Sequence, residues 1–286
     1  MPMPTDVGIV DTVIGFPAKD FEHYEFIRKQ LKDSESAEFD FPVEYMFKGV
    51  PKEKYGADDP IALTLGEMDA CGVEWGLIGC EGEVNRKALA DHPDRFVATC
   101  QIDANDIMGA VRKIRHCKEV YDIRAVGTFP AGCFPQIPID DAKWYPVYAT
   151  CCDLDIPVFV CAGVPGPRLP MDCQHVERLD RVMYDFPELT LVTRHGCEPW
   201  EALAVKLMLK WPGLHYSTSA FAPKHYPKAI VDYANTRGTD KVMYAGYFPM
   251  GLSLQRIMGE MPNVGFRDEV WPKFLRENAA RVLKIT

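Results

Sequence analysis

Short runs of apolar residues recur along the chain, separated by longer segments in which apolar positions return at helical spacing. The runs predict eight β-strands, at residues 7–13, 73–80, 96–102, 123–128, 156–161, 189–194, 214–219 and 241–245. Between them, Ile107, Val111 and Ile114 show the spacing of an amphipathic helix. Strand and helix therefore alternate along most of the sequence.

This alternation favours an α/β fold in which helices cover the outer face of a parallel sheet. Eight such units close naturally into a (β/α)8 TIM barrel of about 250 residues, so we predict one domain over residues 1–286. An open doubly wound sheet is the alternative. It usually carries a glycine-rich phosphate loop after its first strand, whereas this chain has VDTVIGFPAKD there. The barrel is the better prediction.

Residues 15–60 interrupt the alternation of strands and helices. The segment is rich in aromatic residues, prolines and charges, and it is too long for a simple turn. Loops that follow barrel strands cover the catalytic face, so we predict an insertion that acts as a lid, with Tyr24, Phe41, Tyr45 and Phe47 lining the site. A dimer contact or an outer brace is the alternative.

Charge and composition limit the classes of molecule that the protein is expected to bind. A net charge of -9, without a run of basic residues, argues against nucleic acid as a partner. The longest apolar stretch, residues 156–164, is too short to span a membrane, and the N-terminus lacks a signal pattern. The ten cysteines include no CxxC pair and are expected to be reduced thiols. We therefore expect a cytoplasmic protein that binds a small-molecule substrate.

Several phrases of the sequence resemble one known family. They are HPDRF at 92–96, IPVFVCAGVPGP at 156–167, ELTLVTRHGCEPW at 188–200, LHYSTSAF from 214, KVMYAGYFP at 241–249 and the ending FLRENAARVLKI. Together they resemble the amidohydrolase-related family, the metal-dependent TIM-barrel branch that includes aminocarboxymuconate-semialdehyde decarboxylase and aromatic acid decarboxylases. The resemblance spans nearly the whole chain and implies the same barrel.

The resemblance also implies a metal site, which this sequence does not complete. The family pattern has an H-x-H pair closing strand one, histidines ending strands five and six, and an aspartate after strand eight. The positions other than strand six are held here by Val13, Gly15, Cys161 and Tyr247. Only His195 matches, so we predict no bound metal. A zinc ion held by Cys161, His195 and Glu198 is the alternative.

Three residues are candidates for catalysis. His195 follows the sixth strand, and an imidazole there can exchange a proton at cellular pH. Cys161 ends the neighbouring strand and would be a nucleophile beside His195, or else a spectator thiol in a chain that uses cysteine freely. Tyr247 would donate a hydrogen bond to an oxyanion or serve as an aromatic wall.

Five residues are candidates for substrate binding. Arg168 follows a glycine-containing loop and would bind a carboxylate, unless it forms a surface ion pair. Asp11 lies inside the first strand, where a carboxylate needs a partner. Tyr45 belongs to the predicted lid, Glu198 begins the helix after strand six, and His225 lies at the rim after strand seven.

These residues predict an enzyme that hydrolyses a small carboxylated or acyl substrate without a metal, with His195 as the general base for water. Carbon-carbon lyase chemistry of the decarboxylase type is the alternative, with His195 protonating the carbanion. A binding protein on a disabled barrel is a third reading, which a wholly apolar mouth would favour. The resemblance leaves a homodimer open, because related barrels often pair.

Overall fold

The computed structural model describes residues 3–18, 21 and 24–285 of the chain. Eight parallel strands form one sheet in the order of the sequence. They are β1 Ile9–Asp11, β2 Val73–Gly79, β3 Phe96–Ile102, β4 Ala125–Thr128, β5 Val158–Cys161, β6 Leu191–Arg194, β7 Leu214–Ser217 and β8 Val242–Met243. Each lies within the apolar run that predicted it, so the predicted pattern of strands is confirmed.

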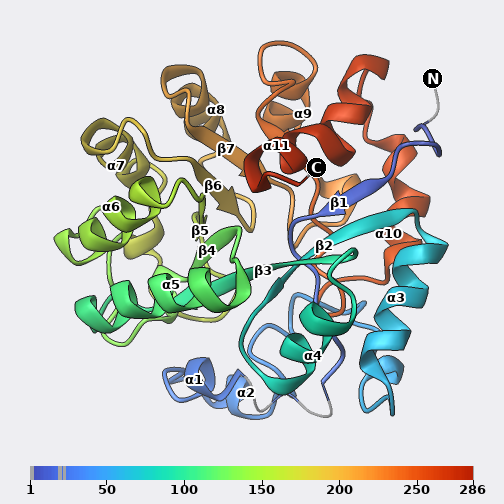
Figure 1. Cartoon of the computed structure of the whole chain (residues 1–286), viewed down its shortest axis with the longest axis horizontal. Coiled ribbons are helices and arrows are strands. Elements are labelled where there is room, and N and C mark those ends of the chain that lie inside the picture. Colours follow the sequence, from blue (N-terminus) through green and yellow to red (C-terminus); the bar gives the residue numbers. More distant parts are fainter. Residues whose placement is uncertain (1–2, 19–20, 22–23, 286) are drawn as a thin grey trace.

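The sheet curls until the end of the first strand meets the segment that follows the last. Tyr247 N donates a hydrogen bond to Val13 O at 2.8 Å. Gly15 N donates to Phe248 O at 2.8 Å, and Ile14 forms a parallel bridge with Phe248. Helices surround the strands (Figure 1). The architecture is the α/β fold of TIM-barrel type that the sequence predicted.

The α-helices occupy the segments between the strands. They are α1 Glu25–Arg28, α2 Ser34–Ala37, α3 Pro60–Ala70, α4 Glu83–Asp91, α5 Ile107–Tyr121, α6 Tyr145–Asp153, α7 Arg178–Asp185, α8 Glu201–Lys210, α9 Lys228–Ala234, α10 Leu254–Glu260 and α11 Asn278–Leu283. Short helical turns are η2 Lys52–Lys54, η3 Pro130–Gly132, η4 Ala142–Trp144, η5 Asp172–Gln174, η6 Pro223–His225, η7 Met261–Asn263, η8 Asp268–Val270 and the π-helical η9 Lys273–Glu277. In the described part of the chain, none of the helices has the length and apolar character needed to cross a bilayer.

Local sequence explains where the longest of these helices begins and ends. The Asp106 carboxylate accepts a hydrogen bond from Gly109 N at 2.9 Å, which satisfies a free amide in the first turn of α5. The helix ends at Asp122, whose φ of 45° is left-handed. Aspartate tolerates that conformation better than most residues, so the cap stops the helix before β4.

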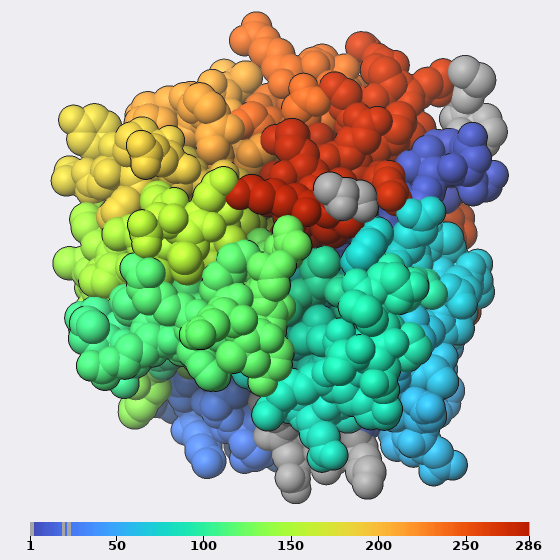
Figure 2. Space-filling view, in the orientation of Figure 1, coloured from blue at the N-terminus to red at the C-terminus, as the bar shows by residue number. Residues whose placement is uncertain are grey.

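The alternation of side chains along the strands separates the barrel interior from the layer that faces the helices. Val10, Phe159 and Val192 pack in the interior, together with Val282 and Leu283 of α11. The residues next to them in the strands, such as Ile9, Val158 and Leu191, pack outward in the main core. Helix α11 thus closes one end of the barrel. It lies above the centre of the view in Figure 1, and residues of the C-terminal segment (red) form part of this face of the molecule in Figure 2.

The described part of residues 15–60 lies over the opposite end, where the strands terminate. Phe41 and Val43 of this segment pack with Met250 in a small cluster that is separate from the main core. The Tyr45 hydroxyl donates a hydrogen bond to Gly166 O, in the loop after β5, at 2.6 Å. The segment therefore contacts loops that follow both β5 and β8.

Candidate active site

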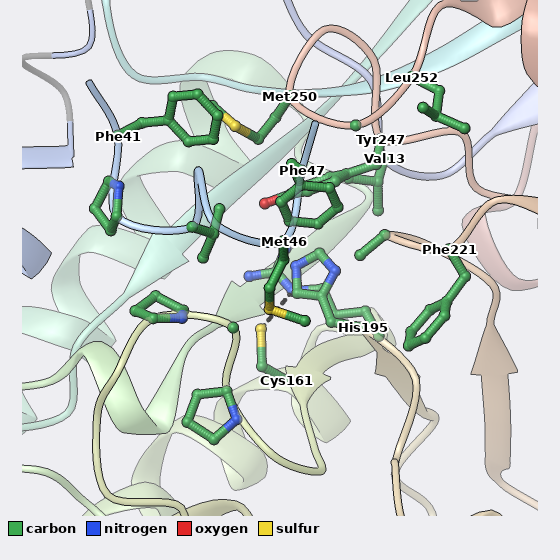
Figure 3. A pocket seen from close by; sticks show the side chains of 18 of the residues that line it. Val13, Phe41, Met46, Phe47, Cys161, His195, Phe221, Tyr247, Met250 and Leu252 are labelled. Atoms are coloured by element: carbon green, nitrogen blue, oxygen red, sulfur yellow. Dashed lines mark hydrogen bonds between the residues drawn. The ribbon is translucent and has the colours of Figure 1, made fainter. Parts of the chain in front are cut away.

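A cavity of about 900 Å³ opens at the carboxyl ends of the strands. Its floor includes Gln101 of β3, Cys161 of β5, Arg194 of β6 and the following His195. Figure 3 shows aromatic and aliphatic side chains around these groups, with Phe41, Met46, Phe47, Phe221, Met250 and Leu252 labelled. The site therefore has largely apolar walls and polar groups at its floor.

His195 lies at the centre of this cavity (Figure 3). Its backbone N donates to Ser219 Oγ at 3.0 Å, and its ring Nδ1 lies 3.0 Å from the same oxygen. Burial, with a smaller contribution from the charge of Arg194, lowers the pKa of His195 to about 3. The imidazole is therefore neutral at physiological pH. If the Ser219 hydroxyl donates to Nδ1, the ring proton resides on Nε2.

The side chain of Arg194 also reaches the floor, and the sequence did not single it out. Its Nε donates to Cys161 Sγ at 3.2 Å, the dashed line at Cys161 in Figure 3. Its Nη2 donates to Gln101 Oε1 at 3.0 Å and to Thr128 O at 3.4 Å. The period of two along β6 places Arg194 on the same side as Val192, which is in the barrel interior. Only the structure shows that Val192 faces the interior, so the sequence alone did not identify Arg194.

Cys161 has the position predicted for it but not the state that a nucleophile needs. The side chain is buried at the end of β5. Burial raises the pKa of the Cys161 thiol, and the nearby Arg194 only partly offsets this rise. A neutral thiol is a weak nucleophile. Its contact is with the guanidinium of Arg194, to which the sulfur is an acceptor.

Tyr247 faces His195 across the cavity. The two ring centroids are 4.8 Å apart, and the Phe47 ring of the lid segment packs at a tilt against Tyr247, with centroids 5.9 Å apart. Burial raises the pKa of Tyr247 to about 12, so its hydroxyl keeps its proton. The hydroxyl is available as a hydrogen-bond donor to a bound molecule.

Backbone strain gathers around the same floor. Four non-glycine residues here have left-handed φ angles, namely His195 (65°), Cys197 (64°), Ala220 (73°) and Tyr247 (64°). Each such residue costs on the order of 1–3 kcal/mol and persists only where the surrounding structure holds it. Clusters of strained backbone conformations are typical of functional sites. The local turns, rather than regular strand geometry, aim His195 and Tyr247 at each other.

The structure brings most of the predicted binding residues to the cavity. Tyr45, Glu198 and His225 line it, the last two as exposed residues of the rim. The predicted lining residues of the lid segment, Tyr24, Phe41 and Phe47, also line it. The sequence missed Gln101, Arg194 and Ser219, because their partners come from other strands.

Two predicted binding residues lie elsewhere. Arg168 forms ion pairs with Asp33 and Glu35 at 2.5 and 2.8 Å and is not among the residues that line the cavity. It ties the lid segment to the loop after β5. Asp11 is fully buried on the helix-facing side of β1, because Val10 takes the interior position. Asp11 is not among the residues that line the cavity.

The side chains do not fit the metal site that the resemblance implies. Val13 and Gly15 offer no ligand atoms at the end of β1, and Tyr247 stands where an aspartate is expected. Among residues 3–18, 21 and 24–285, no group of three or more His, Cys, Asp and Glu side chains is placed to hold an ion. Instead, the guanidinium of Arg194 contacts Cys161, which replaces the histidine expected at strand five.

Sequence comparison identifies the family of this chain. The model of the family described as amidohydrolase matches residues 78–285, which is most of the chain. The chain belongs to the amidohydrolase family. The match begins in β2 and covers β5 and β6, which carry Cys161 and Arg194, and Tyr247 after β8. No curated protein sequence matches this chain.

Solved structures share the fold of this chain at low sequence identity. An uncharacterised TIM-barrel protein from Bordetella bronchiseptica is 24% identical, with a TM-score of 0.77 and 96% of this chain and 98% of that chain covered. A 2,6-dihydroxybenzoate decarboxylase in complex with 2,6-dihydroxybenzoate is 17% identical (TM-score 0.67, 98% and 100% covered). A 5-carboxyvanillate decarboxylase from Novosphingobium aromaticivorans in complex with manganese is 14% identical (TM-score 0.65, 99% and 98% covered). At these identities the likeness is one of fold.

Proposed function

We propose that this protein is a carbon-carbon lyase of the decarboxylase type, acting without a bound metal on a small aromatic or conjugated carboxylic acid. The observation that carries the proposal is the cavity itself. Apolar walls that include Phe47 and Phe221 surround a floor where His195, Tyr247 and Arg194 meet. The fold that it shares with aromatic acid decarboxylases supports the same reaction class.

The proposed chemistry follows from the surroundings of the substrate. Between apolar walls a carboxylate loses most of its water shell and keeps only the polar contacts of the floor, so little hydration remains to be removed as carbon dioxide leaves. The electron pair of the broken bond stays on the substrate carbon until a proton arrives. His195 delivers that proton. Because its pKa is lowered to about 3, its protonated form is scarce at neutral pH but strongly acidic.

Residues 15–60 serve as a lid in this proposal. Tyr24, Phe41 and Phe47 line the cavity from the side of this segment, and Arg168 and Tyr45 hold it against the loop after β5. A lid that excludes water keeps the carboxylate desolvated and protects the carbanion from stray protons. A segment that is held closed over the cavity therefore suits decarboxylation better than a reaction that needs bulk water.

The test is turnover of a panel of small aromatic and conjugated acids in buffer containing a chelator. We expect release of carbon dioxide, and one deuteron in the product at the carbon that lost it when the reaction runs in heavy water. Elemental analysis is expected to find well under one equivalent of metal. Loss of turnover in the chelator, with recovery on adding a divalent metal, would contradict the metal-independent mechanism.

Hydrolysis is the second candidate, because neutral His195 has the form that accepts a proton from water. The two reactions differ in their dependence on pH. If His195 acts as an acid, turnover falls about tenfold per pH unit across about pH 5 to 8, whereas a base with a pKa this low gives a flat profile. Incorporation of isotope-labelled water oxygen into the product identifies hydrolysis. Binding of an acid without any turnover would favour the binding-protein reading.

A further inference from the structure

Arg194 is a cation in the cavity without an anionic partner. Its Nε and Nη2 donate to a thiol sulfur, an amide oxygen and a backbone carbonyl oxygen, which are all neutral acceptors. Within the part of the chain that the structure describes, no carboxylate lies within ion-pair distance of it, and its Nη1 has no hydrogen-bond partner. By contrast, Arg168 and Arg178 each pair with two carboxylates.

The position of this charge makes it a receptor for an anion. Arg194 is partly buried, so its charge has lost part of its hydration without gaining a counter-ion. The guanidinium lies on the floor, next to His195 and beneath the aromatic walls. Other cationic side chains that line the cavity, such as Lys48 and Lys224, are exposed residues of the rim. An acid that enters with its apolar part against the walls meets Arg194 at the floor.

We propose that Arg194 is the anchor for the carboxylate of the substrate and supplies positive charge at a floor whose described side chains do not assemble a site for a metal cation. This inference deepens the proposed function by naming the residue that selects acids over neutral molecules. A guanidinium binds a carboxylate through parallel N–H donors, a geometry that a single ammonium group does not reproduce. The contacts with Cys161 and Gln101 hold its plane in place.

Binding of two matched probes tests this anchor without any turnover. Benzoate and benzamide have nearly the same shape, and only benzoate carries a charge. We expect the parent protein to bind benzoate about ten- to hundredfold more tightly than benzamide in a calorimetric titration, the range of a charge-assisted hydrogen bond. Equal affinities for the two probes, or no saturable binding of benzoate, would overturn the proposal.

Three variants test whether Arg194 is the source of the preference for benzoate over benzamide. Arg194→Met should bind the two probes alike, with benzamide affinity changed by less than about threefold. Arg194→Lys, which keeps the charge, should retain part of the preference and serves as the test should Arg194→Met not fold. Arg115→Met removes an exposed arginine on α5 and is the matched control, which should keep the full preference. A preference for benzoate over benzamide that is retained in Arg194→Met would refute the assignment. So would a preference that is absent in both Arg194→Lys and Arg115→Met.

The binding test also separates this inference from the proposed reaction. If benzoate is preferred through Arg194 but no acid loses carbon dioxide, the anchor stands and the lyase reaction fails. If acids are decarboxylated with the same binding preference in Arg194→Met, the reaction stands and the anchor fails.

Discussion

The buried carboxyl of Asp11 gives this protein a stability that depends on pH. Asp11 is fully buried, and its Oδ1 accepts hydrogen bonds from Val13 N at 3.0 Å and Gly246 N at 2.9 Å. Its Oδ2 has no partner, and neither has the Tyr244 hydroxyl. A Cβ on Gly246 would lie 2.6 Å from both of these oxygens, so they share one small buried space.

The size of the effect follows from the pKa of Asp11. Burial raises this pKa from 3.8 to about 7, against the opposing effect of the two backbone hydrogen bonds. The unfolded chain therefore releases the proton near pH 4, whereas the folded protein keeps it up to about pH 7. Between these values the folded state binds more protons, so the free energy of unfolding falls as the pH rises. The full loss, reached above about pH 7, is about 4 kcal/mol.

Replacing Asp11 with asparagine removes this loss. The amide cannot ionise, its oxygen can still accept from Val13 and Gly246, and its NH2 group takes the place of Oδ2 near the Tyr244 hydroxyl. We expect Asp11→Asn to match the parent near pH 4 and to exceed it by up to about 4 kcal/mol at pH 8. Against a typical total of about 5–15 kcal/mol, that is a large gain.

Urea unfolding followed by tryptophan fluorescence at several pH values between about 4 and 8 measures the difference. The parent's curve alone is not the test, because the lowered pKa values of His195 and His215 add stability as the pH rises from about 3 to 6.5. These histidines are present in both proteins, so the difference between them isolates Asp11. Asp6→Asn, an exposed change just before β1, is the control. A difference that stays constant across the range would refute the reasoning.

Three other substitutions probe the site. His195→Asn should fold, bind substrate and turn it over at least about a hundredfold more slowly; unchanged turnover would make His195 structural. Cys161→Ser should retain most activity, because the thiol is buried and neutral; inactivation, together with substrate protection against a thiol reagent, would indicate a nucleophile instead. Arg168→Ala, which frees Asp33 and Glu35, should speed proteolysis within residues 15–60 while the melting temperature of the barrel changes by only a few degrees; an unchanged cleavage rate would exclude a tether.

The sequence by itself determined the order of the strands and helices. Parallel strands that are covered on both faces read as short apolar runs, so all eight could be located without knowledge of their partners. The helical spacing of Ile107, Val111 and Ile114 likewise marked α5. His195 and Tyr247 were identified because each follows a strand, and the ends of parallel strands meet at one edge.

Only the tertiary structure decided which polar side chains enter the cavity. A strand that is apolar on both faces hides its own alternation, so the sequence did not reveal that Asp11 faces the helices while Arg194 faces the interior. The partners of Arg168 lie more than 130 residues away in the chain, at the start of the short helix α2. Contacts between residues this far apart in the chain decide whether a charged side chain has a partner. The local sequence around each residue does not show these contacts.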